Sequence, residues 1–422
     1  MRMLFAALTS PYPPTNGQRI RNWSLLRALA AEGRRVNLVC FADGPAEAAA
    51  DSALREVCDS VAWVVAGSRG APAAGYLGRL RALPSSLPFG AWRMRSPEMR
   101  AALAGELRQR AFDAVICDDI YMLANIPPAG GVPVLLNKHD ITHVILRRYL
   151  AHERNPLKRL YGEFESRKLH RWETRACASV DGVMACSRLD RELLAASTRR
   201  PIAVVPNVID TAEYPPAPDD DGRSIVFAGA MDWYPNADAA RFLAFRILPL
   251  VRKRVPEARF VIAGRAPEAS LRKRLAGVAE LTGWVPDIRD VIRRAALCVV
   301  PLRIGSGTRL KIVEAAAMQK CVVSTSIGAE GLDFVNGQEI VLADTPEAFA
   351  DSIVELLADG ARRRAIGAAA RKRAVASHGL EALRSAVREI PALCGQLDSA
   401  PAVPVAGGRE EENAIRTAAI EA

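Results

Sequence analysis

Short apolar runs alternate along the chain with longer stretches of helical spacing. In the first half, these runs predict strands at "MLFAALT", "VNLVCFA", "VAWVVA" (61–66), "AVICD" (114–118), "PVLLNKH" (133–139) and "GVMACS" (182–187). Residues 18–33 predict a helix, because Ile20, Trp23, Leu26 and Leu29 share one face and Gly33 ends it. A second helical stretch spans residues 142–178. Strands separated by helices are typical of parallel sheets.

The second half repeats this alternation. Strands are predicted at "SIVFAGA" (224–230), "RFVIAG" (259–264), "VAELTG" (278–283), "LCVVPL" (297–302) and "CVVSTS" (321–326), with a helix over 237–254. The segment "VVPNVIDTAEYPPAPDDDGR" (204–223) is rich in proline and aspartate, which favours a connection between domains. The predicted fold class is therefore α/β, with two doubly wound domains.

These patterns also set the domain boundaries. We expect a first domain over 1–205, a crossover over 206–223 and a second domain over 224–390. Residues 391–422 are rich in alanine, proline and glycine, so they predict a largely disordered tail without chemistry.

Composition narrows the class of partner. The chain has 422 residues and a net charge of +10, which indicates anionic partners: a nucleotide, a phospholipid surface or nucleic acid. Its eight cysteines show no metal-binding or redox spacing, so we expect buried, reduced thiols. The apolar run at the N-terminus is too short for a signal peptide, and no window approaches the roughly 18 residues of a membrane span. The expected location is the cytosol.

Ligands of open parallel sheets bind at the carboxyl ends of the strands, which selects a few loops in the first domain. Gly17 lies in a long proline-rich loop before a helix, where its amide can approach a phosphate or sugar, although a plain turn also fits. His139-Asp140 ends a strand and is a candidate site, with His143 as a fallback. Asp118-Asp119 ends another strand, either as solvated acids or as a metal-binding pair.

Two loops of the second domain meet the same criterion. Gly229 and Ala230 follow the first strand and are small enough to line a cleft, with Asn236 as a candidate helix cap. "LTGWVPD" places Gly283, Trp284 and Val285 after a later strand, where they either hold a flat base or pack Trp284 internally.

The stretch "GSGTRLKIVEAAA" (305–317) carries the most specific chemistry. It predicts a helix with Thr308 as a candidate N-cap and with Arg309 and Lys311 in its first turn, where cations oppose the helix dipole. A Lys311–Glu314 surface pair is one explanation, worth at most about 0.5 kcal/mol. The alternative is a diphosphate held by the glycine turn, Arg309 and Lys311, with Glu314 accepting hydrogen bonds from a ribose.

Residues 147–175 are strongly basic. A solvated helix face explains this charge, and so does docking to anionic lipid. No nucleic-acid-binding motif accompanies the charge, so we expect no nucleic-acid partner. The basic positions are Arg147, Arg148, Arg154, Lys158, Arg159, Arg167, Lys168, Arg171 and Arg175.

Taken in order, several of these motifs resemble one family. The "SPYPPTNG" loop, "VMACS", "VVPNVID", "FVIAG…LTGWVPDI…LCVVPL" and "GTRLKIVEAAAMQKCVVSTSIGAEGL" are similar to the retaining, nucleotide-sugar-dependent glycosyltransferases of GT-B fold, the group 1 or family-four class. The resemblance spans about residues 1–385 and implies two Rossmann-like domains facing each other across a cleft. The form of the last motif resembles a subgroup associated with exopolysaccharide synthesis.

The resemblance implies roles for single residues. Glu314 matches the second glutamate of the family's E-x7-E element, whereas Ser306 stands where the first is expected. The family's basic pair near the start of the second domain is missing, and Arg309 and Lys311 are expected to substitute for it. Gly17 is expected beside the diphosphate or acceptor, and His139 against the donor sugar. Gly229, Gly283, Trp284, Val285, Ser306, Gly307 and Thr308 complete the expected donor site.

The activity implied is retaining transfer of a sugar from a nucleotide-diphosphate sugar to a glycan or lipid-linked acceptor, without a metal or other cofactor. From the basic charge of residues 147–175, a peripheral position on the inner face of the plasma membrane is a further expectation. Two alternatives remain open, a nucleotide-sugar 2-epimerase of the same fold and a non-catalytic binding or scaffold protein. The replacement at Ser306 is the best support for the scaffold protein.

Overall fold

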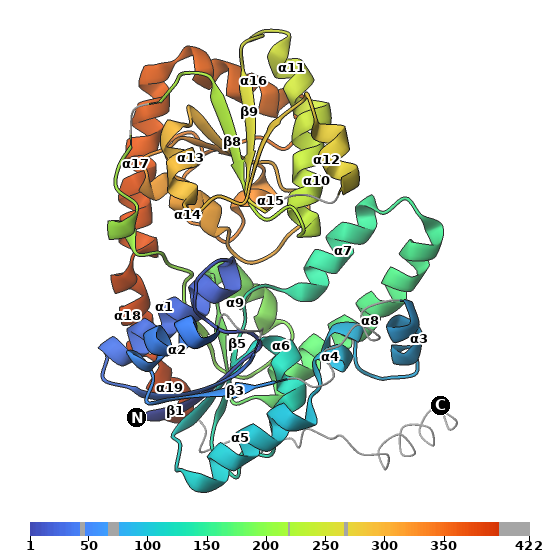
Figure 1. Cartoon of the computed structure of the whole chain (residues 1–422), viewed down its shortest axis with the longest axis vertical. Helices are drawn as coiled ribbons and strands as arrows, with labels where there is room; N and C mark the ends of the chain where they lie inside the picture. The colour runs from blue at the N-terminus through green and yellow to red at the C-terminus, as the bar shows by residue number, and fades with distance from the viewer. Residues whose placement is uncertain (43–46, 66–75, 218–219, 266–268, 396–422) are drawn as a thin grey trace.

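The computed structural model describes residues 1–42, 47–65, 76–217, 220–265 and 269–395. Within them the chain forms two parallel β-sheets, each covered by helices, as the α/β pattern predicts (Figure 1). The last 27 residues of the predicted tail, 396–422, lie outside the described residues.

The first sheet has seven strands in the order β3-β2-β1-β4-β5-β6-β7, all paired in parallel. Six strands lie where the apolar runs predict them, and β7 was missed because its run is short and half-buried. Phe5 of β1 pairs with Leu38 on one side and Ile116 on the other. The strands are β1 (Arg2–Ala7), β2 (Arg35–Phe41), β3 (Ser60–Val64), β4 (Ala114–Asp118), β5 (Val134–Asn137), β6 (Gly182–Ala185) and β7 (Ile202–Val204).

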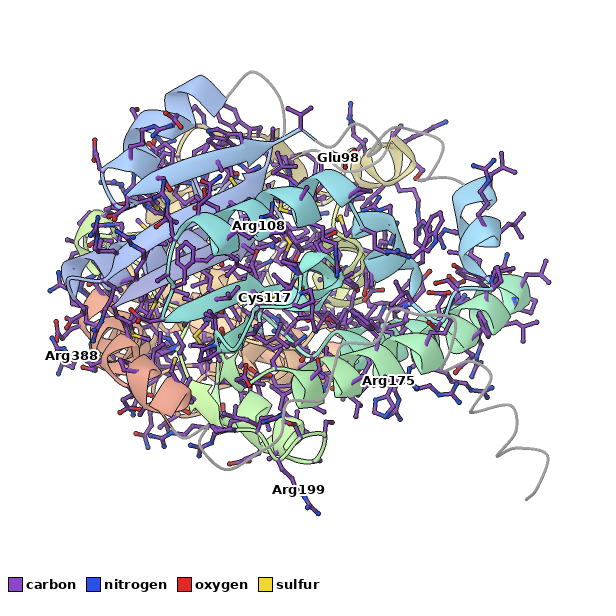
Figure 2. The ribbon with its side chains drawn as sticks, turned by 90° about the horizontal axis from the view of Figure 1, so that it is seen from below. Glu98, Arg108, Cys117, Arg175, Arg199 and Arg388 are labelled. Carbon is purple, nitrogen blue, oxygen red and sulfur yellow. The ribbon has the colours of Figure 1, made fainter. Side chains whose placement is uncertain are left out.

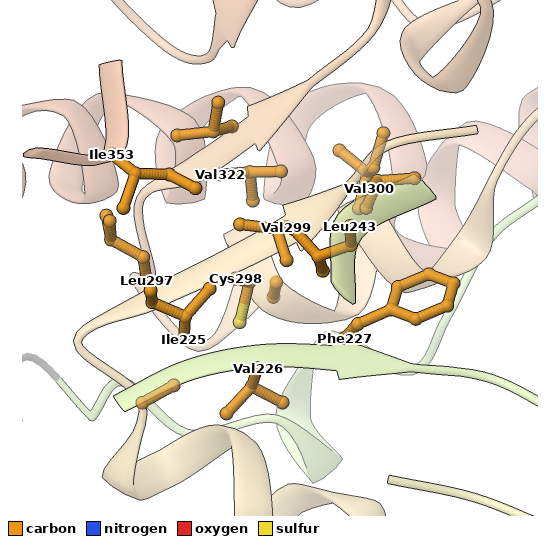
Figure 3. Close-up of a cluster of buried hydrophobic side chains, with 14 of the residues drawn as sticks. Ile225, Val226, Phe227, Leu243, Leu297, Cys298, Val299, Val300, Val322 and Ile353 are labelled. Carbon is orange, nitrogen blue, oxygen red and sulfur yellow. The ribbon is translucent and has the colours of Figure 1, made fainter. Parts of the chain in front are cut away.

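The second sheet repeats the plan with six strands in the order β10-β9-β8-β11-β12-β13. Its central strands are buried on both faces, and Figure 3 shows the apolar side chains of β8 and β11 packed against helices. The two-residue β13 was not predicted, since so short a strand leaves no pattern. The strands are β8 (Ser224–Ala228), β9 (Arg259–Ala263), β10 (Glu280–Gly283), β11 (Leu297–Val300), β12 (Val322–Ser324) and β13 (Val341–Leu342).

Alternation along β1 explains how helices cover both faces of the first sheet. Met3 and Phe5 pack with α1 and the C-terminal helices, while Leu4 and Ala6 pack with α5 and α8. The helices of this part are α1 (Gly17–Ala31), α2 (Glu47–Arg55), α3 (Tyr76–Ala82), α4 (Phe89–Met94), α5 (Pro97–Gln109), α6 (Asp119–Met122), η2 (Leu123–Asn125), α7 (Thr142–His152), α8 (Pro156–Ser179) and α9 (Arg188–Ala195).

Helices also cover the second sheet, and the chain then ends in two helices, α18 (Leu380–Arg388) and α19 (Ile390–Gly395), that pack on the first. The other helices of the second half are η3 (Thr211–Glu213), α10 (Tyr234–Phe242), the π-helical η4 (Leu243–Ile247), α11 (Leu248–Arg252), α12 (Ala269–Leu275), α13 (Ile288–Arg294), α14 (Leu310–Ala317), α15 (Ser326–Ala329), α16 (Pro346–Ala358) and α17 (Gly360–His378).

Two predicted helices have different bounds in the structure. The stretch 142–178 divides into α7 and α8, because Asn155 caps a new helix that has Pro156 at its first position. The helix predicted over 237–254 begins at Tyr234 and contains the π-helical turn.

The C-terminal helices correct the predicted domain boundary. α17 leaves the second domain, and α18 and α19 pack on the first, where Leu383, Val387, Ile390 and Leu393 join the core beside α1 (Figure 1). Residues 380–390 therefore belong to the first domain, and residues 391–395 are helical rather than part of a disordered tail. The sequence could not reveal this return, since an amphipathic helix does not specify which domain it covers.

All eight cysteines are unpaired, and all but the half-buried Cys394 are buried, as predicted. Figure 2, a view from below, labels Cys117 in the middle of the first sheet. Among the helices of the described residues, none is long and apolar enough to cross a membrane.

Candidate functional site between the two sheets

The carboxyl ends of the two sheets face each other, so the loops that follow their strands meet. Strand order reverses between β1 and β4 in the first sheet and between β8 and β11 in the second. Such reversals open a crevice at the carboxyl ends of the strands. The loop after β11 contacts the loop after β5, because the backbone amide of Ile141 donates to Ser306 Oγ at 3.0 Å.

On the first domain, Gly17 opens the helix after β1. Asn16 precedes it, and the side chain of Asn16 accepts a hydrogen bond from the amide of Arg19, which fixes the start of α1. A Cβ on Gly17 would have no atom within 4 Å. The space beside this helix start is open, which suits the approach of a ligand.

His139 lies beside a buried carboxylate. Its Nε2 is 2.5 Å from Oδ1 of Asp118, which ends β4 and is fully buried. Burial alone would raise the pKa of Asp118, but His139 and hydrogen bonds from Gln18 and Asn22 hold that pKa below its usual value. Asp118 therefore orients the imidazole and fixes the ring nitrogen that faces it.

Next to the His139–Asp118 pair, Lys138 forms a second group of charges with Glu173 and Asp119. Lys138 is almost fully buried, and its Nζ lies 2.7 Å from Glu173 and 3.5 Å from Asp119. Glu173 also lies 2.6 Å from His143 Nδ1. Although burial opposes it, Lys138 and His143 lower the pKa of Glu173 to about 2. His143 is thus bonded to Glu173. Asp118 pairs with His139 and Asp119 with Lys138, so the two acids have separate partners.

The glycine turn after β11 presses against the first domain. Gly307 has φ +74, and a Cβ there would lie 2.4 Å from the carbonyl oxygen of His139. Only glycine meets both conditions. On the facing side, Thr142 donates to Asp140 at 2.9 Å, and burial raises the pKa of Asp140 to about 6. Ser306 and Gly307, both predicted in the donor site, therefore hold the domains together in this structure.

Arg309 supports the glycine turn from within. It occupies the N-cap position of α14 rather than its first turn, and only 9% of it is exposed. Its guanidinium donates to the carbonyls of Ser306, Gly307 and Ile327. Burial lowers its pKa, and Glu330 opposes that shift. The structure thus gives Arg309 a role in shaping the loop, and contact with a diphosphate stays a prediction.

Lys311 is the cation that faces the loop after β8. Its Nζ donates to Asn236 Oδ1 at 2.8 Å and lies 4.6 Å from the ring centre of Phe227. Burial, followed by the charge of Arg309, lowers the pKa of Lys311 to about 7. A nearby anion would reverse this shift.

Glu314 lies one turn further along α14. Its Oε1 accepts a hydrogen bond from the hydroxyl of Tyr214 at 3.0 Å, and burial raises its pKa. Lys311 and Glu314 therefore bond to different neighbours, so the alternative of a surface pair between them is wrong. Tyr214 belongs to the crossover and orients the carboxylate that was predicted to contact a ribose.

Gly229 leaves room for Lys311. A Cβ at Gly229 would lie 2.7 Å from Lys311 Nζ and 2.9 Å from Asn236 Nδ2. The prediction that Asn236 caps the following helix is wrong, because Trp233 holds the N-cap position. Asn236 instead donates to the carbonyl of Ala230 and accepts from Lys311, which links α10 to α14.

Gly283 ends β10 with φ +68, and Trp284 follows it with 68% of its surface exposed. Internal packing of Trp284 is therefore excluded, while Val285 is partly buried. Whether Gly283, Trp284 and Val285 hold a base stays a prediction.

Sequence reasoning missed two sets of interdomain contacts. Buried Arg21 of α1 donates to Asn207, which in turn donates to Thr308 Oγ1 at 2.7 Å. Thr308 is thus not a helix cap. A cation and an amide at positions 21 and 22 of a predicted apolar helix were the available signal, and both are more buried than Ile20 and Trp23.

The other missed contact joins α7 to the loop after α15. Arg148 donates to both carboxylate oxygens of Glu330, at 2.6 and 2.8 Å, and to the carbonyl of Gly305. No sequence signal pairs residues so far apart. Among the residues that the structure describes, no three His, Cys, Asp or Glu side chains gather as metal ligands would.

Comparisons with known proteins agree with this architecture. Residues 15–213 match the family model described as Glycosyltransferase Family 4, and residues 222–359 match the one described as Glycosyl transferases group 1. Each model falls on one of the two sheets with its helices. Together they account for most of the described chain.

Three relatives illustrate the similarity. An uncharacterized 44.6 kDa protein in the cps region of Klebsiella pneumoniae is 21% identical over 365 residues, which are 84% of this chain and 90% of the relative. Sucrose-phosphate synthase from Thermosynechococcus elongatus is 18% identical with a TM-score of 0.66, covering 92% of this chain and 98% of its own. Anabaena HepE in complex with UDP-glucose is 14% identical with a TM-score of 0.65, covering 93% and 99%.

Proposed function

Because the chain belongs to the glycosyltransferases of GT-B fold, we propose that it moves a sugar from a nucleotide-diphosphate sugar to a glycan or lipid-linked acceptor. We further propose that the transfer retains the anomeric configuration, needs no metal and serves exopolysaccharide or cell-surface polysaccharide synthesis. The similarity to a protein of a cps region supports this role, and the similarity to HepE solved with UDP-glucose supports the donor class.

The observation that carries the proposal is the environment of Lys311. The second domain holds this half-buried cation with a neutral amide as its hydrogen-bond partner, and desolvation followed by the charge of Arg309 lowers its pKa to about 7. Gly229, whose missing side chain opens this space, directly follows β8 at the reversal of strand order. The carboxylate of Glu314 acts on Lys311 without forming an ion pair with it, and a diphosphate at this point would supply that direct partner.

Departure of the nucleotide diphosphate is the step that needs most stabilisation, because negative charge develops on the phosphate oxygen. We assign this role to Lys311 and to the amides at the start of α14, with Arg309 holding the glycine turn in shape. Fixed donors act strongly on charge that develops away from bulk water. Cations of the protein can thus perform the neutralisation for which a metal is otherwise used.

On the opposite side, His139 would meet the donor sugar. Its ring is fixed by Asp118, and Gly307 of the other domain packs against its carbonyl. The acceptor hydroxyl would then attack from the face that the diphosphate leaves. Its proton would pass to the departing phosphate oxygen, so the bond to the phosphate breaks as the bond to the acceptor forms. Contact between the domains would exclude water and limit hydrolysis of the donor.

Glu314 is proposed to hold the ribose. The hydroxyl of Tyr214 orients the carboxylate, which is half-buried and whose pKa is raised by desolvation. Gly283, Trp284 and Val285 would hold the base at the edge of the second sheet, with the exposed indole beside it.

Calorimetric titration with UDP, GDP and ADP, followed by a mass-spectrometric screen of sugar donors, tests the proposal. We expect one nucleoside diphosphate to bind and the matching nucleotide sugar to be consumed. His139→Ala should lower transfer about tenfold or more while the Kd of the diphosphate changes by less than about twofold, because only the sugar is contacted. His152→Ala, on an exposed end of α7, is the matched control.

The outcomes separate the alternatives. If none of the nucleoside diphosphates binds, both enzyme hypotheses are wrong. Binding without transfer to any lipid-linked or glycan acceptor would favour the scaffold protein, which the loop-holding role of Ser306 also suits. A 2-epimerase needs a histidine in the second domain, whereas His378 is buried and bonds to the carbonyl of Asn207.

A further inference from the structure

Large apolar side chains are exposed on two neighbouring helices of the first domain. On α3, Leu77 is 67% exposed and Leu80 60%. On the first turns of α8, Leu157 is 77% exposed, Leu160 72% and Phe164 44%. We call these five residues the α3–α8 surface. Isolated exposed leucines are ordinary, but a group of this kind marks an interaction surface.

Helical spacing places these side chains in stripes. Leu77 and Leu80 are three residues apart on α3, and Leu157, Leu160 and Phe164 follow the i, i+3, i+7 pattern of one face of α8. The opposite face of α8, with Leu169 and the ion pair of Glu165 and Lys168, is buried in the domain. α8 is therefore amphipathic with an apolar stripe on its outer side.

The two helices are held together, so the stripes form one surface. Lys168 of α8 donates to the carbonyl of Ala82 at the end of α3, at 3.0 Å. The guanidinium of Arg79 lies 5.6 Å from the ring centre of Tyr161 on α8 and 5.5 Å from that of Phe89 on α4. Figure 1 shows α3 and the first half of α8 side by side at one flank of the lower domain, next to α7.

The charge around this surface is positive. Arg81, Arg154, Lys158, Arg159 and Arg167 are exposed on or beside the two helices, and Glu163 is the exposed acid among them. Only part of the basic region over 147–175 is therefore available to face a lipid surface. Arg148 is bonded to Glu330 of the other domain, and Lys168 is buried, so neither contributes. Leucine and phenylalanine surrounded by cations are typical of helices that lie in the interface of an anionic membrane.

We propose that the α3–α8 surface docks the protein onto an anionic lipid bilayer, with the five apolar side chains inserted among the acyl chains and the basic residues against the headgroups. The docking itself is independent of sugar transfer. If the proposed function holds as well, docking brings the facing edges of the two domains near a lipid-linked acceptor, because α7 contacts the second domain through Arg148 and only three residues separate it from α8.

Sedimentation of the full-length protein with vesicles tests this proposal. The probes are vesicles of pure phosphatidylcholine and vesicles of equal parts phosphatidylcholine and phosphatidylglycerol. We expect binding to the anionic vesicles to be roughly tenfold stronger and to weaken as salt is added, because exposed charges are screened. Leu157→Ser/Leu160→Ser should bind about tenfold more weakly, since less apolar area enters the bilayer.

Matched controls keep the result interpretable. Leu193→Ser removes an apolar side chain that is 45% exposed on α9, away from the surface, and should bind vesicles as the wild type does. Lys158→Ser/Arg159→Ser should lose the preference for anionic vesicles, while Arg364→Ser on α17 should keep it. Because the substituted side chains are exposed and are not part of the core, circular dichroism should show the same helix content in each variant as in the wild type.

Two outcomes would overturn the proposal. One is equal weak binding of the wild type to both vesicles with no effect of the substitutions. The other is a wild type that self-associates in sedimentation velocity through these residues, which would assign the surface to a second copy of the chain. Titration of the Leu157→Ser/Leu160→Ser variant with nucleoside diphosphates reports on the proposed function separately, and should match the wild type.

Discussion

The two sheet edges that face each other differ in how their charged side chains are paired. On the first domain, Asp118 pairs with His139, and Lys138 pairs with Glu173 at 2.7 Å, whereas burial raises the pKa of the neighbouring Asp140 to about 6. On the second domain, Lys311 bonds to the neutral amide of Asn236, and its pKa falls to about 7. The first edge therefore holds ion pairs of its own, whereas Lys311 on the second edge forms none among the described residues, although the nearby Glu314 partly offsets its charge.

This difference separates stability from binding. A buried pair contributes little net free energy when intact, but removing one partner leaves an unpaired buried charge. A partly buried cation that lacks an ion-pair partner is desolvated at a cost to stability, so its removal should not destabilise the folded state. The first edge should therefore be sensitive to substitution in unfolding experiments, and the second in ligand-binding experiments.

Lys138→Met gives the largest expected effect. It leaves the carboxylate of Glu173 buried beside Asp119 without its cation, and should lower the free energy of unfolding by about 3–5 kcal/mol. Urea denaturation followed by fluorescence measures the change. Lys372→Met on the exposed face of α17 is the control and should stay within about 0.5 kcal/mol of the wild type. Equal stability of the two variants would show that the ion pairs of Lys138 do not contribute to the stability of the fold.

Lys311→Met should show the opposite pattern. The proposed diphosphate loses a charge-assisted hydrogen bond, so its Kd should rise by about 10- to 100-fold. The unfolding free energy should be unchanged or higher, since a buried cation with a lowered pKa is removed. Calorimetry with the bound nucleoside diphosphate and urea denaturation measure the two quantities. A variant that unfolds more easily but binds normally would reverse the comparison.

The pKa of Lys311 also predicts how pH acts on binding. With a pKa of about 7 in the free protein, Lys311 becomes neutral above that pH, whereas a bound diphosphate favours its charged form. Affinity should therefore fall as pH rises from about 7 to 9, by up to about tenfold per unit, with uptake of up to one proton on binding. Calorimetry in buffers of different ionisation enthalpy measures this uptake.

The same group has an opposite effect on the free protein. Because its pKa is lower in the folded than in the unfolded state, the unfolded chain binds more protons between about pH 7 and 10. The contribution of Lys311 should thus make the protein more stable as pH rises through this window. The Lys311→Met variant should lose both dependences, and a wild type whose affinity is flat over the window would contradict the assignment.

The sequence predicted the fold closely because both sheets are parallel and buried. Such strands appear as continuous apolar runs, and their order follows from repeated crossovers between them. It failed for β7 and β13, which are short, and for α18 and α19, whose apolar faces do not say which domain they cover. Those choices depend on the packing of residues far apart along the chain.

That His139, Lys311 and Glu314 form one site stays a prediction, and the structure shows the partner of each. Residue type and strand ends were not enough to identify those partners. Thr308 and Asn236 looked like helix caps because their residue types favour that role, yet both bond across elements instead. Arg309 was predicted to bind an anion, and the structure shows that it also donates to carbonyls of its own loop and of Ile327 in α15. Such partners follow from tertiary contacts that a single sequence does not record.

The smallest expected effect concerns the contact that joins the two edges. Arg148→Ala removes the paired hydrogen bonds to Glu330, both of which are partly buried, and should weaken the association of the domains by about 1 kcal/mol. Global unfolding should change little, because each domain keeps its own core. Small-angle X-ray scattering should instead show a larger radius of gyration without ligand, and a nucleoside diphosphate should still bind, since Lys311 is untouched. Arg147→Ala, next to it on α7, is the control. If Arg148→Ala lowers the free energy of unfolding as much as Lys138→Met does, the first domain depends on its contact with the second domain for its stability.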